Sequence, residues 1–207
     1  MKRNVIFAAA TLLLLGTASV SAATIIDEWA SVKAPPAPVL KPVTADPKTT
    51  ALLLLDFINP NCTNRPRCIG SLPAMNALLK QARDKGVMVV YSVAGQATKA
   101  NIMKELTPAD SDPVVRSSVD KFTGTDLEKI LRDKGIQTVI VAGTAAHGAV
   151  LYTGSVAALK GFNVVIPVDG MSSEDPFYEQ ATAWLLAKGT GGIGPKVTLT
   201  KSDMIAF

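Results

Sequence analysis

The chain has 207 residues, of which 48% are hydrophobic and 5% are aromatic, and its formal net charge at pH 7 is +4. Because the basic residues are scattered and aromatic residues are few, the composition lacks the charge and stacking pattern of a nucleic-acid-binding protein. The length suits one α/β domain with a sizeable core and is too short for two such domains.

The first residues predict export. The cations Lys2 and Arg3 precede an apolar run from Val5 to Gly16, and small residues follow up to Ala22. This pattern is typical of a secretory signal peptide, and we expect cleavage after Ala22. The apolar run is shorter than the roughly 20 residues that span a bilayer, so we expect no membrane anchor after cleavage. The predicted location is therefore periplasmic or secreted.

Beyond the predicted signal peptide of residues 1–22, the chain changes character at about residue 49. Residues 23–48 are rich in Pro, Ala, Val and Lys. Proline disfavours the interior of both helices and sheets, so this segment is predicted to form an extended arm or linker. Residues 49–207 are predicted to form a single folded domain.

Apolar runs alternate with helical patterns in the predicted domain. The runs TALLLLDF, GVMVVYSV, IQTVIVAG, FNVVIPVDG and KVTLT are continuously apolar, which is typical of strands buried on both faces of a parallel sheet. Predicted helices lie between them, at residues 71–85, 124–134, 147–160 and 174–188. Three of these helices end in a glycine, at Gly86, Gly135 and Gly161. The predicted fold is a three-layer, doubly wound, Rossmann-like α/β domain with a mostly parallel sheet.

The two cysteines, Cys62 and Cys68, lie in NPNCTNRPRCIG. In an exported protein this C-x5-C pair predicts a loop-closing disulfide. A redox pair would have C-x-x-C spacing, and a zinc site would need further ligands, whereas the single histidine is remote. The motifs of phosphate loops, dinucleotide-binding turns and nucleophile elbows are missing from the sequence. We therefore expect no metal and no cofactor.

In a doubly wound sheet the ligand site lies beyond the carboxyl ends of the strands. Asp56 follows four leucines at such an end, where poor solvation suits a carboxyl group to acid or base chemistry, although it could instead cap a turn. Gln96 follows the next strand. Thr144 and His147 lie in the turn after the third strand, where His147 either meets a substrate or only ties the turn together. Asp169 more simply caps a turn.

Two segments, ALLLLDFINP and KFTGTDLEKILRDKGIQTVIVAGTAAHGAVLYTGSVAALKGFNVVIPVDGMSS, resemble the isochorismatase-like superfamily, also called the cysteine hydrolases. Their order and spacing extend the resemblance from Thr50 to Ile205. The resemblance implies that Asp56 is the catalytic aspartate. It also implies a nucleophilic cysteine at the start of the helix after the third strand, but here that position is Ala149. Since a methyl group cannot attack a carbonyl carbon, a thioester-forming amidase is hard to support.

The family also has a catalytic lysine before the segment that contains Phe122 in this chain. Arg116 occupies the aligned position, and Lys121 directly precedes Phe122. Either cation could stabilise a negative charge or hold a substrate carboxylate, but arginine cannot donate a proton at ordinary pH, so chemistry favours Lys121. By the resemblance, a small-molecule substrate would also meet Arg116, Gln96, Thr144, His147 and Ala149, with Gln96 some residues later than the family's glutamine. The resemblance makes a homo-oligomer possible.

Three functional hypotheses follow. The first is an exported hydrolase that acts on a small metabolite through Asp56 without a thiol, as some isochorismatases do. The alternative is a catalytically degenerate relative that binds a small molecule or a protein partner without turnover. The third keeps a thiol mechanism by recruiting Cys62 or Cys68 from the neighbouring loop. Export counts against isochorismate itself as the natural substrate, because that compound is a cytosolic intermediate.

Overall fold

The computed structural model describes residues 23–207, so the predicted signal peptide lies outside the described residues. The described chain divides into two compact units, one up to Pro36 and the other from Ala37 to Phe207. The first contains the short helix α1 (Ile25–Glu28), which the preceding Thr24 caps by donating from its N–H and hydroxyl to Asp27 at 2.8 and 2.9 Å. Within residues 23–207, no helix is both long and apolar enough to cross a membrane.

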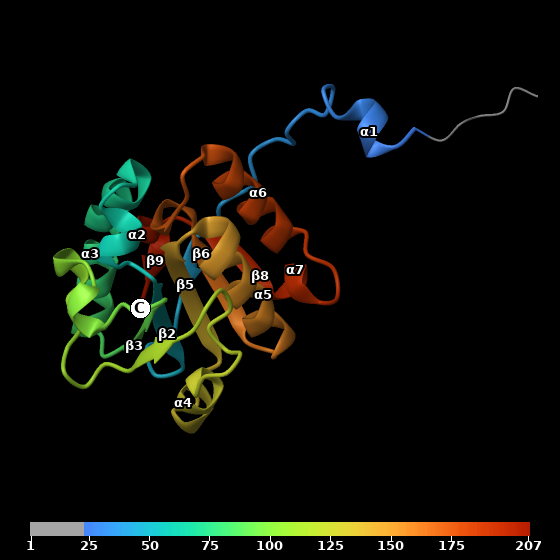
Figure 1. The fold of residues 1–207 in the computed structure, drawn as a ribbon. Helices are drawn as coiled ribbons and strands as arrows, with labels where there is room; N and C mark the ends of the chain where they lie inside the picture. Colours follow the sequence, from blue (N-terminus) through green and yellow to red (C-terminus); the bar gives the residue numbers. More distant parts are fainter. Residues whose placement is uncertain (1–22) are drawn as a thin grey trace, which may run out of the picture. The chain divides into compact units, whose positions relative to one another are not determined.

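The second unit is built around a parallel sheet (Figure 1). The strands are β2 (Thr50–Leu55), β3 (Met88–Val93), β4 (Val114–Arg116), β5 (Thr138–Thr144), β6 (Asn163–Pro167), β7 (Met171–Ser172) and β8 (Val197–Thr200). The main path of the sheet runs in the order β4-β3-β2-β5-β6-β8, and β7 pairs with β5 beside this path. The recorded pairings within this sheet are all parallel. The predicted α/β class with a mostly parallel sheet is confirmed.

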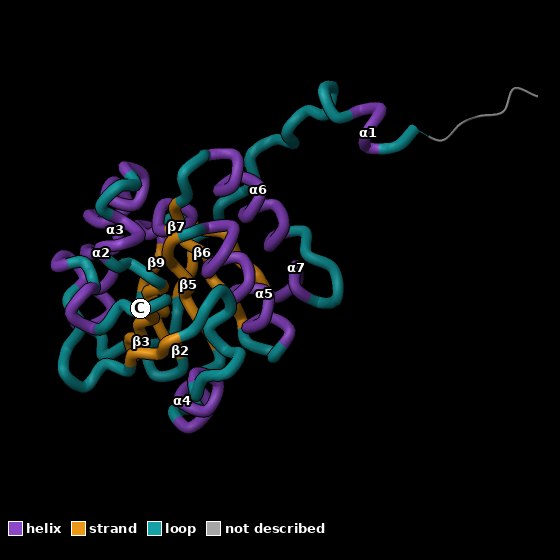
Figure 2. The backbone as a smooth tube through the Cα atoms, viewed as in Figure 1, coloured by secondary structure: helices purple, strands orange, loops and turns teal. Residues whose placement is uncertain are grey.

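Helices cover both faces of the sheet, as Figure 2 shows. The central strand β2 is buried at every position, and its side chains alternate between two cores. The larger helices are α3 (Pro66–Asp84), α4 (Leu127–Asp133), α5 (Leu151–Leu159) and α6 (Pro176–Ala187). Leu53 and Leu55 pack in the core shared with α4, α5 and α6, whereas Leu52 and Leu54 pack in the core shared with α3. This explains why the strand is a continuous apolar run in the sequence.

The helix boundaries differ from the predicted ones chiefly at the N-terminal ends. Helix α3 begins at Pro66, five residues before the predicted start, because proline is well suited to the first position of a helix. It follows the short helix α2 (Asn59–Cys62), and α7 (Ile193–Lys196) precedes β8. Gly86 and Gly135 adopt φ values of 73° and 68° after α3 and α4, the left-handed geometry that ends a helix.

Part of the segment predicted as an extended arm pairs with the C-terminal end of the chain. Strand β1 (Val43–Thr44) runs parallel to β9 (Ile205–Ala206), and the Ala45 N–H donates to the Ala206 carbonyl at 2.8 Å. Residues 37–48 therefore belong to the same compact unit as the sheet. The predicted disulfide is confirmed: Cys62 and Cys68 are bonded, with their Cα atoms 5.2 Å apart. It joins the end of α2 to the first turn of α3.

Candidate active site

Asp56 lies at the carboxyl end of β2 in an unusual backbone conformation. Its φ of 54° is the only positive value at a non-glycine residue among residues 23–207. Aspartate tolerates this left-handed region better than most residues, but the conformation persists only where its surroundings impose it. Here the Asp56 N–H donates to both the carbonyl and the hydroxyl of Ser92, at 3.2 and 3.1 Å. The neighbouring strand β3 therefore fixes the turn that aims the carboxylate.

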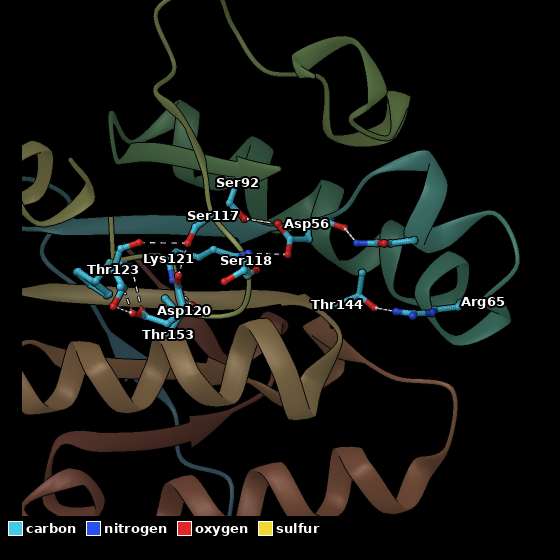
Figure 3. Close-up of polar contacts among 12 residues, drawn as sticks. Asp56, Arg65, Ser92, Ser117, Ser118, Asp120, Lys121, Thr123, Thr144 and Thr153 are labelled. Atoms are coloured by element: carbon cyan, nitrogen blue, oxygen red, sulfur yellow. Dashed lines mark hydrogen bonds and ion pairs between the residues drawn. The ribbon is translucent and has the colours of Figure 1, made fainter. Parts of the chain in front are cut away.

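The Asp56 carboxylate is buried and bound on both oxygens (Figure 3). The Ser92 hydroxyl donates to Oδ1 at 2.7 Å, and the Lys121 ammonium donates to Oδ2 at 2.7 Å. Asp56 is 4% exposed and Lys121 is 0% exposed. A buried ion pair is strongly coupled because little solvent screens it, although taking both charges out of water is costly. The arrangement keeps one acid and one cation in direct contact at the sheet edge.

The loop before α4 points the Lys121 side chain inward. The Lys121 N–H donates to Thr153 of α5 at 3.2 Å, and the Thr125 hydroxyl donates to the Lys121 carbonyl at 2.6 Å. The next residue, Phe122, packs in the core between the sheet and α5. At its tip, the ammonium also donates to the Ser118 carbonyl at 2.6 Å. Backbone and side-chain contacts thus hold the cation against Asp56.

The structure brings Lys121, and not Arg116, to Asp56. Arg116 ends the outer strand β4, is exposed, and donates to the Gly95 carbonyl at 2.5 Å. Gln96 is also exposed and lines a cavity of about 530 Å³ beside the ends of β2 and β3. Asn61 lines the same cavity and donates to the Asp56 carbonyl at 3.2 Å. Arg116 and Gln96 therefore lie near the edge but outside the buried pair.

Thr144 ends the strand next to β2. Leu55 pairs with Gly143 in the register of β2 and β5, so Asp56 and Thr144 each follow a residue of the last pair at this edge of the sheet. The Thr144 hydroxyl donates to the Ser172 carbonyl at 3.2 Å and accepts from the Arg65 guanidinium at 3.4 Å. The sequence did not point to Arg65, which comes from the loop closed by the disulfide.

His147 contacts the β7–α6 side of the site rather than the Asp56–Lys121 pair. Its Nδ1 lies 2.9 Å from the hydroxyl of Ser173, which also accepts from the Ala146 N–H at 3.1 Å. Its ring packs against Tyr178 with the centroids 4.3 Å apart, and Nε2 lies 3.8 Å from Glu174. The histidine therefore ties the turn to the β7–α6 segment, and its side chain is 39% exposed.

Ala149 lies in a short π-helical turn, Ala146–Val150, that leads into α5. It is 4% exposed and packs in the core with Phe122. Its methyl group supplies no nucleophile. Both cysteines of the chain are bonded to each other, so the structure holds no free thiol to replace it. Within residues 23–207, no group of three or more His, Cys, Asp or Glu side chains is arranged to hold a metal ion.

Ser92 is the clearest site residue that sequence reasoning missed. It lies inside the apolar run of β3, where a single serine carries no motif. The parallel register pairs it with Leu55, one residue before Asp56, and that pairing is the signal that could have found it. Asp169, in contrast, accepts from the N–H and hydroxyl of Ser202 at 2.8 and 2.6 Å and anchors the C-terminal segment.

Comparisons with known proteins agree with this architecture. Residues 50–194 match the family model described as the isochorismatase domain. The secreted isochorismatase effector Isc1 of Verticillium dahliae is 28% identical over 148 residues, which cover 65% of this chain and 78% of that protein. The N-carbamoylsarcosine amidase of an Arthrobacter species is 36% identical over 78 residues, but the match covers only 37% of this chain and 30% of the amidase.

Solved structures of the same architecture are also similar to this chain. A cysteine hydrolase from Pseudomonas syringae pv. phaseolicola superimposes with a TM-score of 0.69 at 18% identity, covering 80% of this chain and 94% of that one. The N-carbamoylsarcosine amidase of Thermoplasma acidophilum gives a TM-score of 0.63 at 21% identity, covering 75% and 97%. At these identities the likeness establishes the fold alone.

Proposed function

Because the chain belongs to the isochorismatase family, we propose that it is a hydrolase that acts on a small metabolite by a thiol-independent mechanism centred on Asp56. The observation that carries this proposal is the buried Asp56–Lys121 pair, joined at 2.7 Å at the sheet edge, together with the methyl group of Ala149 where the family has its nucleophile. The site keeps the groups that move and stabilise a proton, and lacks the group that forms a covalent bond.

Hydrolysis of a vinyl ether fits this set of groups. In our proposal the Lys121 ammonium passes a proton to the Asp56 carboxylate, and Asp56 delivers it to the vinyl carbon, which leaves an oxocarbenium ion. Water bonds to the cationic carbon and gives up a proton that returns through Asp56 to Lys121, and the resulting hemiketal separates into a carbonyl compound and an alcohol. Ser92 and Lys121 hydrogen-bond to the two carboxyl oxygens of Asp56 and so orient the carboxyl group toward the substrate carbon. His147 and Thr144 form polar walls of the site.

We expect Asp56→Asn to lower the hydrolysis rate by a factor of about 100 or more, the usual contribution of a positioned general acid. Asparagine keeps the shape of the side chain but cannot donate an acidic proton. The assay follows product release by NMR, with isochorismate and simpler enol ethers as test substrates. Asp84→Asn, an exposed position at the end of α3, is the charge-matched control and should keep the full rate. An unchanged rate in Asp56→Asn, with folding intact, contradicts the mechanism.

The second candidate function is binding without turnover. The contacts between Asp56 and Lys121 also fit this function. The two side chains are almost fully buried and neutralise each other's charge, as in an ion pair with a purely structural role. A degenerate relative would then use the sheet edge to hold a small molecule or a protein partner. In that case a ligand raises the melting temperature while no product forms. Product formation from any of the test substrates decides between the two functions.

We also propose that the protein is exported to the periplasm or secreted. The support is the signal-peptide pattern of residues 1–22 and the name of the Verticillium relative, a secreted effector. Protein recovered outside the cytoplasm is expected to begin at Ala23, as measured by intact mass. Leu13→Arg, which places a charge in the apolar run, should abolish both export and cleavage. Recovery of extracytoplasmic protein that still begins at Met1 contradicts cleavage.

A further inference from the structure

We propose that Arg65 binds a carboxylate group of the ligand and that the Cys62–Cys68 disulfide holds Arg65 in position for this. The inference deepens the proposed function and rests on it only in placing the ligand next to Asp56. It assigns a ligand class: a small organic anion whose carboxylate lies a few bonds from the atom that faces Asp56.

The backbone of Arg65 is fastened to both bridged cysteines. Its N–H donates to the Cys62 carbonyl at 2.9 Å, and its own carbonyl accepts from the Cys68 N–H at 2.9 Å. Both cysteines are 0% exposed, and their disulfide closes the segment. Arg65 is also the residue from which α3 begins. The bridge therefore fixes the point from which the arginine side chain leaves the backbone.

The side chain extends from this loop to the sheet edge, as Figure 3 shows. The guanidinium donates to the Thr144 hydroxyl at 3.4 Å, a long hydrogen bond that leaves most of its N–H groups free for a ligand. Thr144 follows Gly143, and Gly143 pairs with Leu55, the residue directly before Asp56. Since neighbouring strands lie about 5 Å apart, we infer that a ligand held by Arg65 lies within reach of Asp56.

The charge of Arg65 has no counterpart within the described residues. Arg67, two residues later, is paired with Glu179, and their hydrogen bond raises the pKa of the Arg67 guanidinium. No carboxylate of residues 23–207 lies within ion-pairing distance of Arg65, although its side chain is partly buried. Asp56 and Lys121 neutralise each other. The Arg65 guanidinium is therefore left without a paired carboxylate, which suits the binding of an anion.

The position of Arg65 in the helix supports the same conclusion. The N-terminal end of a helix carries partial positive charge, so an arginine there is electrostatically unfavourable unless an anion compensates it. Helix α3 has 19 residues and no acidic residue in its first turn. A bound carboxylate would interact favourably with both the guanidinium and the helix end. The placement of Arg65 therefore favours the binding of an anion at this end of α3.

Matched pairs of carboxylates and amides test this inference. We would titrate the mature protein, by calorimetry or ligand-observed NMR, with acetate, pyruvate and benzoate and with acetamide, pyruvamide and benzamide. At least one carboxylate should bind, about tenfold or more tightly than its neutral amide. Arg65→Gln should abolish this preference, and Arg65→Lys should keep part of it. Lys80→Gln, an exposed position on the same helix that also removes a positive charge, is the control and should keep the preference.

The role of the disulfide is tested separately. The double variant Cys62→Ser and Cys68→Ser should lose the carboxylate preference while circular dichroism shows it folded. In the unsubstituted protein, the bound carboxylate should make the disulfide harder to reduce at equilibrium, seen as a shift in the midpoint of a dithiothreitol redox titration, and the matching amide should not, because binding and loop order are reciprocally linked. This second measurement keeps the test valid if the double variant does not fold.

Several results would overturn the inference. Equal affinity for a carboxylate and its amide, no binding of any carboxylate, or a preference that survives in Arg65→Gln each contradicts the assignment of Arg65. Unchanged disulfide reduction in the presence of the bound carboxylate contradicts the positioning role of the bridge. None of these measurements requires turnover. An unchanged rate in Asp56→Asn would therefore contradict the hydrolase proposal without affecting the carboxylate preference assigned to Arg65. Loss of the carboxylate preference would likewise leave the hydrolase proposal unaffected.

Discussion

Replacing Lys121 by methionine is expected to destabilise the folded protein by about 3–5 kcal/mol, the usual effect of removing one partner of a buried ion pair. Methionine has a similar length and fills the space, but it leaves the Asp56 carboxylate at 4% exposure without its cation. The Ser118 carbonyl loses its donor as well. Urea denaturation monitored by circular dichroism measures the change in the free energy of unfolding.

The matched experiment removes both charges. In the double variant Asp56→Asn and Lys121→Met, no unpaired charge is left in the interior, so most of the lost stability should return. Lys134→Met, at an exposed position after α4, is the control and should change stability by no more than about 0.5 kcal/mol. A double variant that is as unstable as Lys121→Met alone would show that the charge of Asp56 is not the cause.

Gly143→Ala is the second substitution with a large expected effect. A Cβ at this position would lie 2.5 Å from the Leu55 carbonyl oxygen and 2.6 Å from the Leu55 Cβ. These atoms belong to a paired strand and cannot move aside as a flexible side-chain tip could. We expect a loss of about 3 kcal/mol or more, the upper range for overpacking. We also expect slower turnover, because Asp56 follows Leu55 directly.

Gly148→Ala provides the control in the same turn. The nearest atom to an added Cβ there is the Ala145 Cβ at 3.9 Å, an ordinary contact. Since alanine also favours helical conformation over glycine, stability should stay within about 0.5 kcal/mol or rise. Thermal unfolding of both variants compares the two positions directly. Equal melting temperatures for the two variants would mean that β2 and β5 can separate without loss.

In our proposal the site uses Asp56 as its acid and Lys121 as its cation, and it has Ala149 in place of a nucleophile. Such a change at one position leaves the scaffold intact, since Ala149 packs in the core as a small apolar residue. The fold alone therefore does not establish the chemistry. What distinguishes the two candidate functions is whether Asp56 can deliver a proton to a bound ligand, and the Asp56→Asn assay measures that property.

The sequence by itself determined the fold class and the position of Asp56. Continuous apolar runs such as Thr50–Leu55 are buried on both faces, and Gly86 and Gly135 end helices in the left-handed conformation. Both features can be predicted from one segment at a time, because its residues alone show its secondary-structure propensity and its pattern of burial. The disulfide was predictable for a similar reason, because Cys62 and Cys68 lie close together along the chain.

Only the tertiary structure decided which side chains meet Asp56. Alignment left Arg116 and Lys121 as alternatives, and the loop that packs Phe122 into the core turns Lys121 inward. Ser92 and Arg65 carry no motif and reach the site from β3 and from the disulfide loop. Contacts of this kind depend on strand register and on loop paths between distant segments. Hydrophobic periodicity records which face of an element is buried, but it does not record which distant side chain lies opposite.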